Sequence, residues 1–333
     1  MNFSFRPTQI FVEENVADFP TTQRILEKFP AIRVEKVSDI HPLKSKEGTK
    51  KLLLLARKKS DPLKEFQALS CSAHVNYYSL DLISNCHLEC TYCILQSYLE
   101  NNPILTIYTN LEEILEKLSE DLKTKPRSIV GTGRIADSLA LESVTGYAAA
   151  LIRFFANQNS YLELKTKADC VDTLLNIDHK GRTIISWSLA PDVIIQREEY
   201  KTADLEERLK AMKKVADAGY KIGLHMDPVI VHEGWQKNYR ELVQKIFQDL
   251  SPESIFWASV GTLRFPNRQK RVMEKRFPKN QEIFEGLQST HRRFLHYEDN
   301  LRSQIYEVLC GELEKFLPEK KIFTCMEESL VSI

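Results

Sequence analysis

From residue 75 onward, apolar positions follow two alternating patterns. Short runs rich in β-branched and aromatic residues predict strands over 76–83, 128–131, 161–166, 183–189, 221–228 and 254–260. Between them, apolar residues recur with a helical period, which predicts helices over 111–123, 145–155, 168–176, 203–218 and 238–250. Gly219 follows the fourth of these, at the position where a glycine ends a helix. Repeated strand–helix alternation predicts an α/β fold whose parallel sheet curls into a partial (β/α)6 barrel of the TIM type.

The two ends of the chain do not follow this alternation. Residues 1–70 contain turn signals, a short predicted helix over 22–28 and an apolar run over 51–56 that predicts a buried strand. We expect them to form an N-terminal extension that packs on a barrel built from residues 71–265. Residues 266–333 are predicted to be a C-terminal extension, helical and charged from about residue 280.

Composition narrows the class of protein. The 333 residues are 43% hydrophobic and 28% charged, which is typical of a globular protein. No apolar run approaches the roughly 20 residues of a membrane span, and the first residues do not resemble a secretory signal. A cytoplasmic protein without a membrane partner is therefore expected. The 46 basic and 46 acidic residues exclude general attraction to nucleic acid but allow a local basic patch.

Three of the seven cysteines lie within eight residues, as Cys86, Cys90 and Cys93. This C-x3-C-x2-C spacing suits neither a disulfide framework nor a closed zinc site, which usually takes four ligands. His87 is an alternative fourth zinc ligand, although it lies inside the same short loop. Three thiolates on a [4Fe–4S] cluster would leave one iron open to a small molecule. The loop follows the first predicted barrel strand, where such folds build active sites.

This motif, with an aromatic residue just before its third cysteine, resembles that of the radical S-adenosylmethionine superfamily. The resemblance implies that the open iron binds S-adenosylmethionine and that its reductive cleavage gives a 5′-deoxyadenosyl radical. An electron donor such as flavodoxin or ferredoxin would then be a partner.

Several polar residues are predicted at the ends of later strands, where they could contact this cofactor. His225 and Asp227 point the same way along one strand, and a histidine satisfied by hydrogen bonds in the core is an equal alternative. Lys165 competes with Lys167, which could pair with a carboxylate or a phosphate. The candidate cofactor contacts are Gly131, Thr132, Gly133, Ser138, Lys167, Ser188 and Asp227.

A closer resemblance, over roughly residues 7–280, is to the spore photoproduct lyase family. It is carried by 85–96, 137–138, 166–167, 186–189 and, above all, His232-Glu233-Gly234-Trp235. The resemblance implies a lyase that repairs the methylene-bridged thymine dimer in DNA, with the lesion flipped from the duplex. It also implies that the three cysteines hold the cluster, that Ser138, Lys167 and Ser188 contact S-adenosylmethionine, and that Tyr92 is a tyrosine on the cofactor side. A related radical enzyme acting on another nucleic-acid base or on a small molecule is the alternative.

Two positions depart from the Bacillus-type members of that family. Their hydrogen-donating cysteine corresponds to Ala136, and their second tyrosine corresponds to Ile94. Cys71, fifteen residues before the cysteine motif, is the predicted replacement donor. The alternative is a buried structural cysteine, and Cys170, in a predicted helix, is a weaker candidate donor.

A basic stretch follows the last predicted barrel strand. Residues 264–276 carry six basic side chains and one acidic side chain. Phosphate contacts need such local charge even in a neutral protein, whereas a solvated helix face is the alternative. The predicted DNA contacts are Arg264, Arg268, Lys270 and Arg271.

Overall fold

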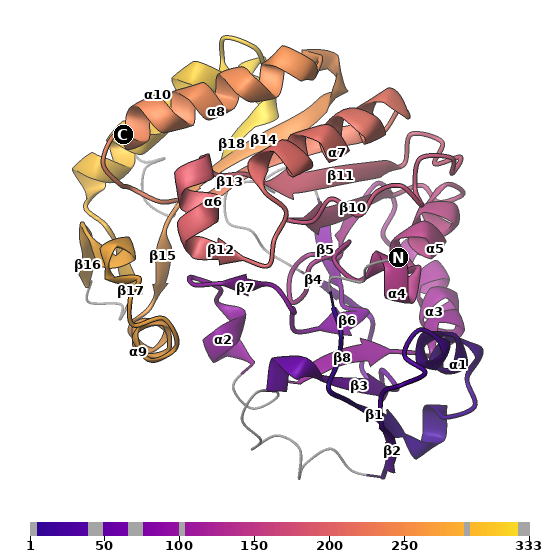
Figure 1. The fold of residues 1–333 in the computed structure, drawn as a ribbon. Helices are drawn as coiled ribbons and strands as arrows, with labels where there is room; N and C mark the ends of the chain where they lie inside the picture. Colours follow the sequence, from indigo (N-terminus) through magenta and orange to yellow (C-terminus); the bar gives the residue numbers. More distant parts are fainter. Residues whose placement is uncertain (1–4, 39–48, 66–75, 100–103, 290–293, 326–333) are drawn as a thin grey trace.

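The main sheet of the computed structural model is the predicted partial barrel. The structure describes residues 5–38, 49–65, 76–99, 104–289 and 294–325. The sheet has eight strands in the order β18-β14-β13-β11-β10-β9-β5-β4, parallel except for the edge strand β4. Their bounds are Leu63–Glu65 (β4), Tyr77–Leu80 (β5), Ile129–Gly131 (β9), Tyr161–Thr166 (β10), Thr183–Ser188 (β11), Lys221–Val229 (β13), Ile255–Thr262 (β14) and Ile322–Thr324 (β18). The six predicted strands are thus confirmed, as neighbours in chain order (Figure 1).

Helices cover the outside of this sheet (Figure 1). They are α3 (Leu111–Lys123), α4 (Glu142–Thr145), α5 (Tyr147–Phe155), α6 (Asp192–Glu198), α7 (Leu205–Asp217), α8 (Trp235–Asp249) and α10 (Asp299–Leu313). Gly219 adopts a positive φ just after α7, as predicted. The helix predicted over 168–176 is wrong, because this segment forms successive turns. Val171 and Leu174 are buried by those turns, which explains why their spacing looked helical.

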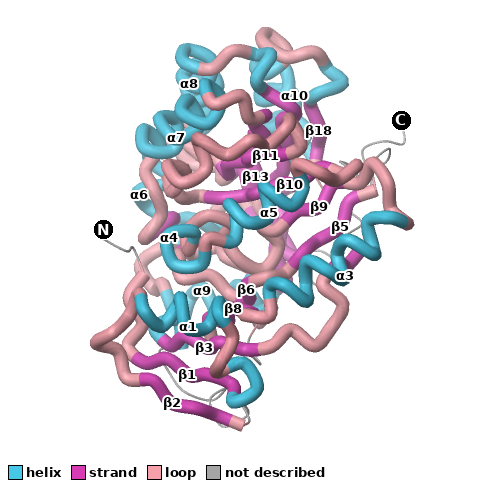
Figure 2. The backbone as a smooth tube through the Cα atoms, turned by 90° about the vertical axis from the view of Figure 1, so that its right-hand side faces the viewer, coloured by secondary structure: helices cyan, strands magenta, loops and turns pink. Residues whose placement is uncertain are grey.

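A second sheet packs beneath the barrel, in the order β2-β1-β3-β8-β6 (Figure 2). It contains β1 (Gln9–Glu13), β2 (Val34–Val37), β3 (Leu52–Ala56), β6 (Ile83–Ser84) and β8 (Leu105–Tyr108), and α1 (Pro20–Glu27) lies on it. The predicted buried strand is β3, in which Leu53, Leu54 and Leu55 are fully buried. Because β6 and β8 come from residues after 70, this sheet crosses the predicted boundary of the N-terminal extension and adjoins the cysteine loop.

The C-terminal part is mixed rather than helical. After β14 come β15 (Arg264–Pro266) and α9 (Asn267–Arg276), then the antiparallel strands β16 (Leu287–Ser289) and β17 (Phe294–Tyr297). The strand β18 returns to the main sheet beside β14. The expectation of a helical segment from about residue 280 is therefore correct for α10 alone.

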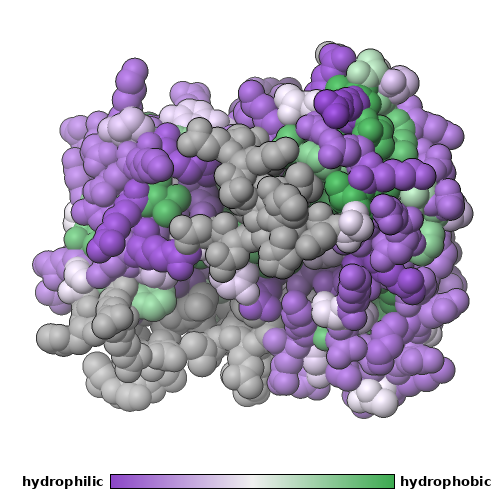
Figure 3. Space-filling model, turned by 90° about the horizontal axis from the view of Figure 1, so that it is seen from below, coloured by the Kyte–Doolittle hydropathy of each residue, from purple (hydrophilic) through white to green (hydrophobic). Residues whose placement is uncertain are grey.

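The described surface seen from below is mostly hydrophilic, with small separate hydrophobic areas (Figure 3). Among the described residues, no helix is both long and apolar enough to cross a membrane.

Candidate active site

The cysteine loop begins where β6 ends. Asn85 adopts a left-handed backbone conformation, with φ of 75°, which asparagine tolerates better than most residues. Its side-chain oxygen accepts a hydrogen bond from the Cys86 amide (2.8 Å), and its own amide donates to the Ile135 carbonyl. The chain therefore turns sharply into the motif and is fixed to the loop after β9.

The middle of the cysteine loop is paired with a distant segment. The two-residue strand β7 (Glu89–Cys90) runs antiparallel to β12 (Glu199–Tyr200), so that Cys90 lies opposite Glu199. Thr91 donates from its amide to the Glu198 carbonyl (2.8 Å) and from its hydroxyl to the Glu198 carboxylate (2.5 Å). The short helix α2 (Leu95–Tyr98) follows the third cysteine.

Glu199 connects this loop to the barrel. Its carboxylate accepts from Lys167 Nζ (3.0 Å), from Arg208 Nη2 (2.6 Å) and from the Tyr92 hydroxyl. Burial alone would raise the pKa of Glu199, but the cations of Lys167 and Arg208 lower it to about 2. Burial and the Glu199 charge hold the pKa of Tyr92 well above its usual value, so its hydroxyl keeps its proton. We call Glu199, Lys167, Arg208 and Tyr92 the Glu199 cluster.

The three thiols lie within electrostatic reach of one another. Burial, followed by the charge of Asp137, raises the pKa of Cys86 to about 12, and burial also raises the pKa of Cys90. Within the described residues, no three His, Cys, Asp or Glu side chains converge to hold a single metal ion. Since each thiolate of an iron–sulfur cluster binds a different iron, this soft, spread donor set fits a [4Fe–4S] cluster.

A polar turn links the loop after β9 to the end of β10. The Asp137 carboxylate accepts hydrogen bonds from the amide of Lys167 (2.7 Å) and the hydroxyl of Thr166 (2.7 Å). Next to it, Ser138 Oγ lies 2.6 Å from the Thr132 hydroxyl and accepts from the Lys165 amide (3.0 Å). The structure thus brings Thr132, Ser138 and Lys167 together beside the cysteine loop.

The glycines at the end of β9 and just after it have a packing reason. A Cβ atom on Gly131 would lie 1.8 Å from the Tyr77 hydroxyl oxygen, and one on Gly133 would lie 2.5 Å from the Lys165 Cβ. These two positions therefore exclude any side chain, independently of a ligand. Their predicted contact with the cofactor stays a prediction.

Further inside the barrel, Glu163 is the centre of a second network. Its carboxylate accepts from the Tyr77 hydroxyl, from Ser186 Oγ (2.7 Å) and from His225 Nε2 (2.9 Å). His225 Nδ1 lies 2.5 Å from Ser259 Oγ and accepts from that hydroxyl, since Nε2 carries the proton. His225 is thus the hydrogen-bonded core histidine that was the alternative. We call these five residues the Glu163 network.

Asp227 and Ser188 occupy different surroundings. Asp227 forms an ion pair with Arg264 (3.3 Å) and lies against Gly261, where a Cβ would come within 2.6 Å of its carboxyl carbon. Ser188 is buried, and its carbonyl accepts from Arg208 Nη1 (2.9 Å). Ser188 therefore adjoins the Glu199 cluster, whereas the structure pairs Asp227 with a residue that was predicted to contact DNA.

The other predicted DNA contacts lie on α9. Arg268 donates to the Ser97 carbonyl (3.0 Å), and Lys270 lies 3.8 Å from Glu274 and over the ring of Phe284. Arg271 is exposed. The basic stretch is thus partly engaged within the protein, and Arg271 faces solvent.

The segment His232–Trp235 begins helix α8. Gly234 precedes the helix with φ of 71°, and Trp235 is buried in the core. His232 is held by the Ile230 carbonyl (2.9 Å) and the Asn238 side chain (3.0 Å). In this structure the segment shapes a strand-to-helix turn.

Comparison with known proteins agrees with the site. The family model described as Spore photoproduct lyase matches residues 5–324. The chain belongs to the spore photoproduct lyase family. It is 26% identical to the spore photoproduct lyase of Bacillus subtilis (strain 168), covering 97% of this chain and 99% of that protein. It is 29% identical to that of Clostridium acetobutylicum, covering 81% of this chain and 82% of that protein.

Solved structures of spore photoproduct lyase share the fold. One is a double mutant, with a cysteine changed to alanine and a serine changed to cysteine, bound to AdoMet and dinucleoside spore photoproduct. It superposes with a TM-score of 0.83 at 23% identity, covering 96% of this chain and 98% of that chain. A complex with dinucleoside spore photoproduct gives a TM-score of 0.82, also at 23% identity and with the same coverage.

A spore photoproduct lyase needs a radical source, which the family implies is a [4Fe–4S] cluster with S-adenosylmethionine. Sequence reasoning found the cysteine loop but missed Glu199, Arg208 and Glu163. Glu199 and Arg208 had no signal, because an acid in a charged stretch after one helix and an arginine on the next look solvated. The sequence did carry a signal for Glu163, because a glutamate between Leu162 and Leu164 in a buried strand is unusual.

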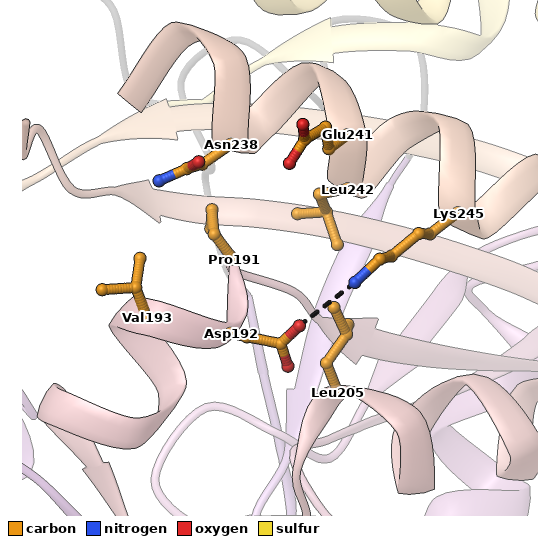
Figure 4. A pocket seen from close by; sticks show the side chains of 8 residues that line it. All are labelled: Pro191, Asp192, Val193, Leu205, Asn238, Glu241, Leu242 and Lys245. Carbon is orange, nitrogen blue, oxygen red and sulfur yellow. Dashed lines mark hydrogen bonds and ion pairs between the residues drawn. The ribbon is translucent and has the colours of Figure 1, made fainter. Parts of the chain in front are cut away.

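One hollow of the described surface lies away from this site. It is formed by α6, α7 and α8, and an ion pair between Lys245 and Asp192 (3.2 Å) spans it (Figure 4). Its lining residues are Pro191, Asp192, Val193, Leu205, Asn238, Glu241, Leu242 and Lys245. It contains none of the residues predicted to contact cluster, cofactor or DNA.

Proposed function

We propose that this protein is a radical lyase that restores two thymines from the spore photoproduct in DNA. The observation that carries the proposal is the Glu199 cluster, which joins the cysteine loop to Lys167 at the carboxyl ends of the barrel strands. Ligands and catalytic groups of such barrels gather at that end. The family membership then supplies the lesion as substrate.

Cys86, Cys90 and Cys93 would hold the [4Fe–4S] cluster. When bound, the cluster supplies the electron that cleaves S-adenosylmethionine into methionine and a 5′-deoxyadenosyl radical. The chain positions this cofactor with Lys167, whose ammonium suits a carboxylate, and with the Ser138 and Ser188 hydroxyls. The proposed cofactor contacts are Gly131, Thr132, Gly133, Ser138, Lys167, Ser188 and Asp227.

The lesion would lose a hydrogen atom from C6 to the 5′-deoxyadenosyl radical, which gives 5′-deoxyadenosine, and the bridging bond would then break and leave a thymine allyl radical. Returning a hydrogen atom needs a thiol, because an S–H bond yields its hydrogen readily to a carbon radical. Ala136 has none. We therefore propose Cys71 as the hydrogen-atom donor. We propose Tyr92 as a second catalytic residue, on the cofactor side of the site. Cys71 lies outside the described residues.

Cys71→Ala tests the donor directly on the dinucleoside lesion. With dithionite as the reductant, we expect the variant to consume lesion but to give misrepaired products or a sulfinate formed from the dithionite-derived SO2 radical anion, because the allyl radical lacks its thiol. Cys170→Ala is the matched control and should repair cleanly. Clean repair by Cys71→Ala would remove Cys71 from the mechanism.

We propose DNA as the physiological substrate, with Arg264, Arg268, Lys270 and Arg271 near its phosphates. A flavodoxin or ferredoxin would supply the electron, and the cytoplasm would keep the thiols reduced. If phosphate contacts dominate, affinity for lesion-bearing duplex should fall steeply between about 50 and 200 mM salt. A flat response would contradict the basic stretch as a DNA surface.

The proposed function is tested by anaerobic reconstitution with iron and sulfide, followed by S-adenosylmethionine, a chemical reductant and the dinucleoside spore photoproduct. We expect the lesion to be converted into two linked thymidines, with 5′-deoxyadenosine formed only in the reduced protein. Formation of 5′-deoxyadenosine without conversion of the lesion would instead favour a different substrate.

A further inference from the structure

Helix α9 lies against the cysteine loop, although more than half of the chain separates them in sequence (Figure 1). The side-chain amide of Gln269 donates to the Cys93 carbonyl at 2.8 Å. Arg268, the residue before Gln269, donates to the Ser97 carbonyl at 3.0 Å. Both acceptors are main-chain oxygens, one at the third cysteine and one in α2 just after it, so the contact fixes the path of the backbone there.

The far end of α9 reaches the same loop by a second route. Arg276 donates to the side-chain oxygen of Gln96 (2.7 Å) and to the carboxylate of Glu89 (2.8 Å). Gln96 in turn donates its amide hydrogens to the carbonyls of Cys90 (3.0 Å) and Thr91 (2.8 Å). Two glutamine amides therefore satisfy the carbonyls of the second and third cysteines and of Thr91.

Gln269 is an unusual residue for its position. It is fully buried, and its side-chain oxygen has no hydrogen-bond partner among the described residues. An unpaired buried polar atom costs stability, and methionine would fill a similar volume without that cost. Packing alone thus does not explain a glutamine here, whereas its bond to the Cys93 carbonyl does.

We propose that Gln269 is a positioning residue for the cluster, holding the Cys93 end of the loop in its binding conformation. Arg276, acting through Gln96, does the same for the Cys90 end. Residues beyond the barrel are therefore part of the cluster site. The inference rests on the proposed function only in that the loop binds a cluster, and the arrangement of the loop can be measured without one.

The test uses cluster-free protein. Gln269→Met and Arg276→Met are compared with wild type by mass-spectrometric alkylation of each cysteine, with Cys310 on α10 as the internal reference. In Gln269→Met we expect Cys93 to react about fivefold faster relative to Cys310, the factor that corresponds to one ordinary hydrogen bond. Lys275→Met, an exposed site on the same helix, should change nothing.

The second readout is iron loss from reconstituted protein to a chelator, which should be faster in both α9 variants than in Lys275→Met. An unchanged Cys93 ratio in Gln269→Met would overturn the proposal. Equal acceleration of Cys93 and Cys310 would overturn it too, because that result means general loosening of the fold. If Gln269→Met fails to fold, Arg276→Met decides. Iron loss from Arg276→Met that is no faster than from Lys275→Met would contradict the proposal. Neither readout depends on lesion repair.

Discussion

Two buried glutamates, Glu163 in the barrel strand β10 and Glu199 in the short strand β12, differ in the groups that hydrogen-bond to them. Glu163 accepts hydrogen bonds from three neutral donors on three strands, and Glu199 accepts from two cations and a tyrosine. Burial opposes the charge of both carboxyls, yet the pKa of each is lowered to about 2, for Glu163 first by the charge of Lys165 beside its hydrogen bonds and for Glu199 by the charges of Lys167 and Arg208. The Glu163 network is complete within the barrel, so it holds the sheet together. In the Glu199 cluster, Lys167 is partly exposed and can also serve a ligand.

Glu163 therefore stabilises the scaffold, whereas Glu199 positions the side chains of the site. Arg208 is fully buried and depends on Glu199 for its counter-charge, which keeps the carboxylate in place. Lys167, which is partly exposed, pairs with the same carboxylate. A cofactor carboxylate could therefore recruit Lys167 without leaving either Glu199 or Arg208 unpaired.

The largest expected effect on stability is that of Glu199→Gln. It leaves the buried Arg208 charge uncompensated, and breaking such a pair costs about 3 to 5 kcal/mol. Urea unfolding measures the change, and the iron bound per chain should fall with it because the carboxylate that holds Tyr92 and Lys167 beside the cysteine loop is gone. Retention of both wild-type stability and wild-type iron would show that the cluster does not need this carboxylate.

Glu163→Gln should cost less, about 1.5 to 3 kcal/mol, because hydrogen bonds to a charged acceptor are replaced by bonds to a neutral one. Iron content should stay at the wild-type value, measured on the same preparations. Selective iron loss with little change in the urea midpoint would reverse the roles assigned to the two glutamates.

The smallest effect concerns pH. Burial, then the cation of Lys165, lowers the pKa of His225 below 6.5, against the opposing charges of Glu163 and Asp227. The unfolded chain therefore takes up this proton first, so the contribution of His225 is present above pH 6.5 and is lost as the pH falls below it. The urea midpoint of wild type should decline between pH 7.5 and pH 5.5 more than that of His225→Asn. Parallel declines would show that folding does not shift the pKa of His225.

Much of the barrel was predictable from sequence because its strands are buried runs of characteristic length. The strand over 161–166 has the predicted bounds, and the cysteine spacing identified the metal ligands proposed here. The Glu199 cluster was not predictable, since β12 has two residues and its pairing with Cys90 depends on tertiary contact. Nor was the role of α9, because its charges read as a surface patch while Gln269 forms the key contact.

The most direct test measures iron and lesion repair together after replacing each cysteine. We predict that Cys86→Ala, Cys90→Ala and Cys93→Ala each lose the iron–sulfur absorbance, 5′-deoxyadenosine formation and conversion of the dinucleoside lesion, whereas Cys170→Ala retains all three. A colourless zinc protein, or repair that survives the loss of Cys93, would contradict the account.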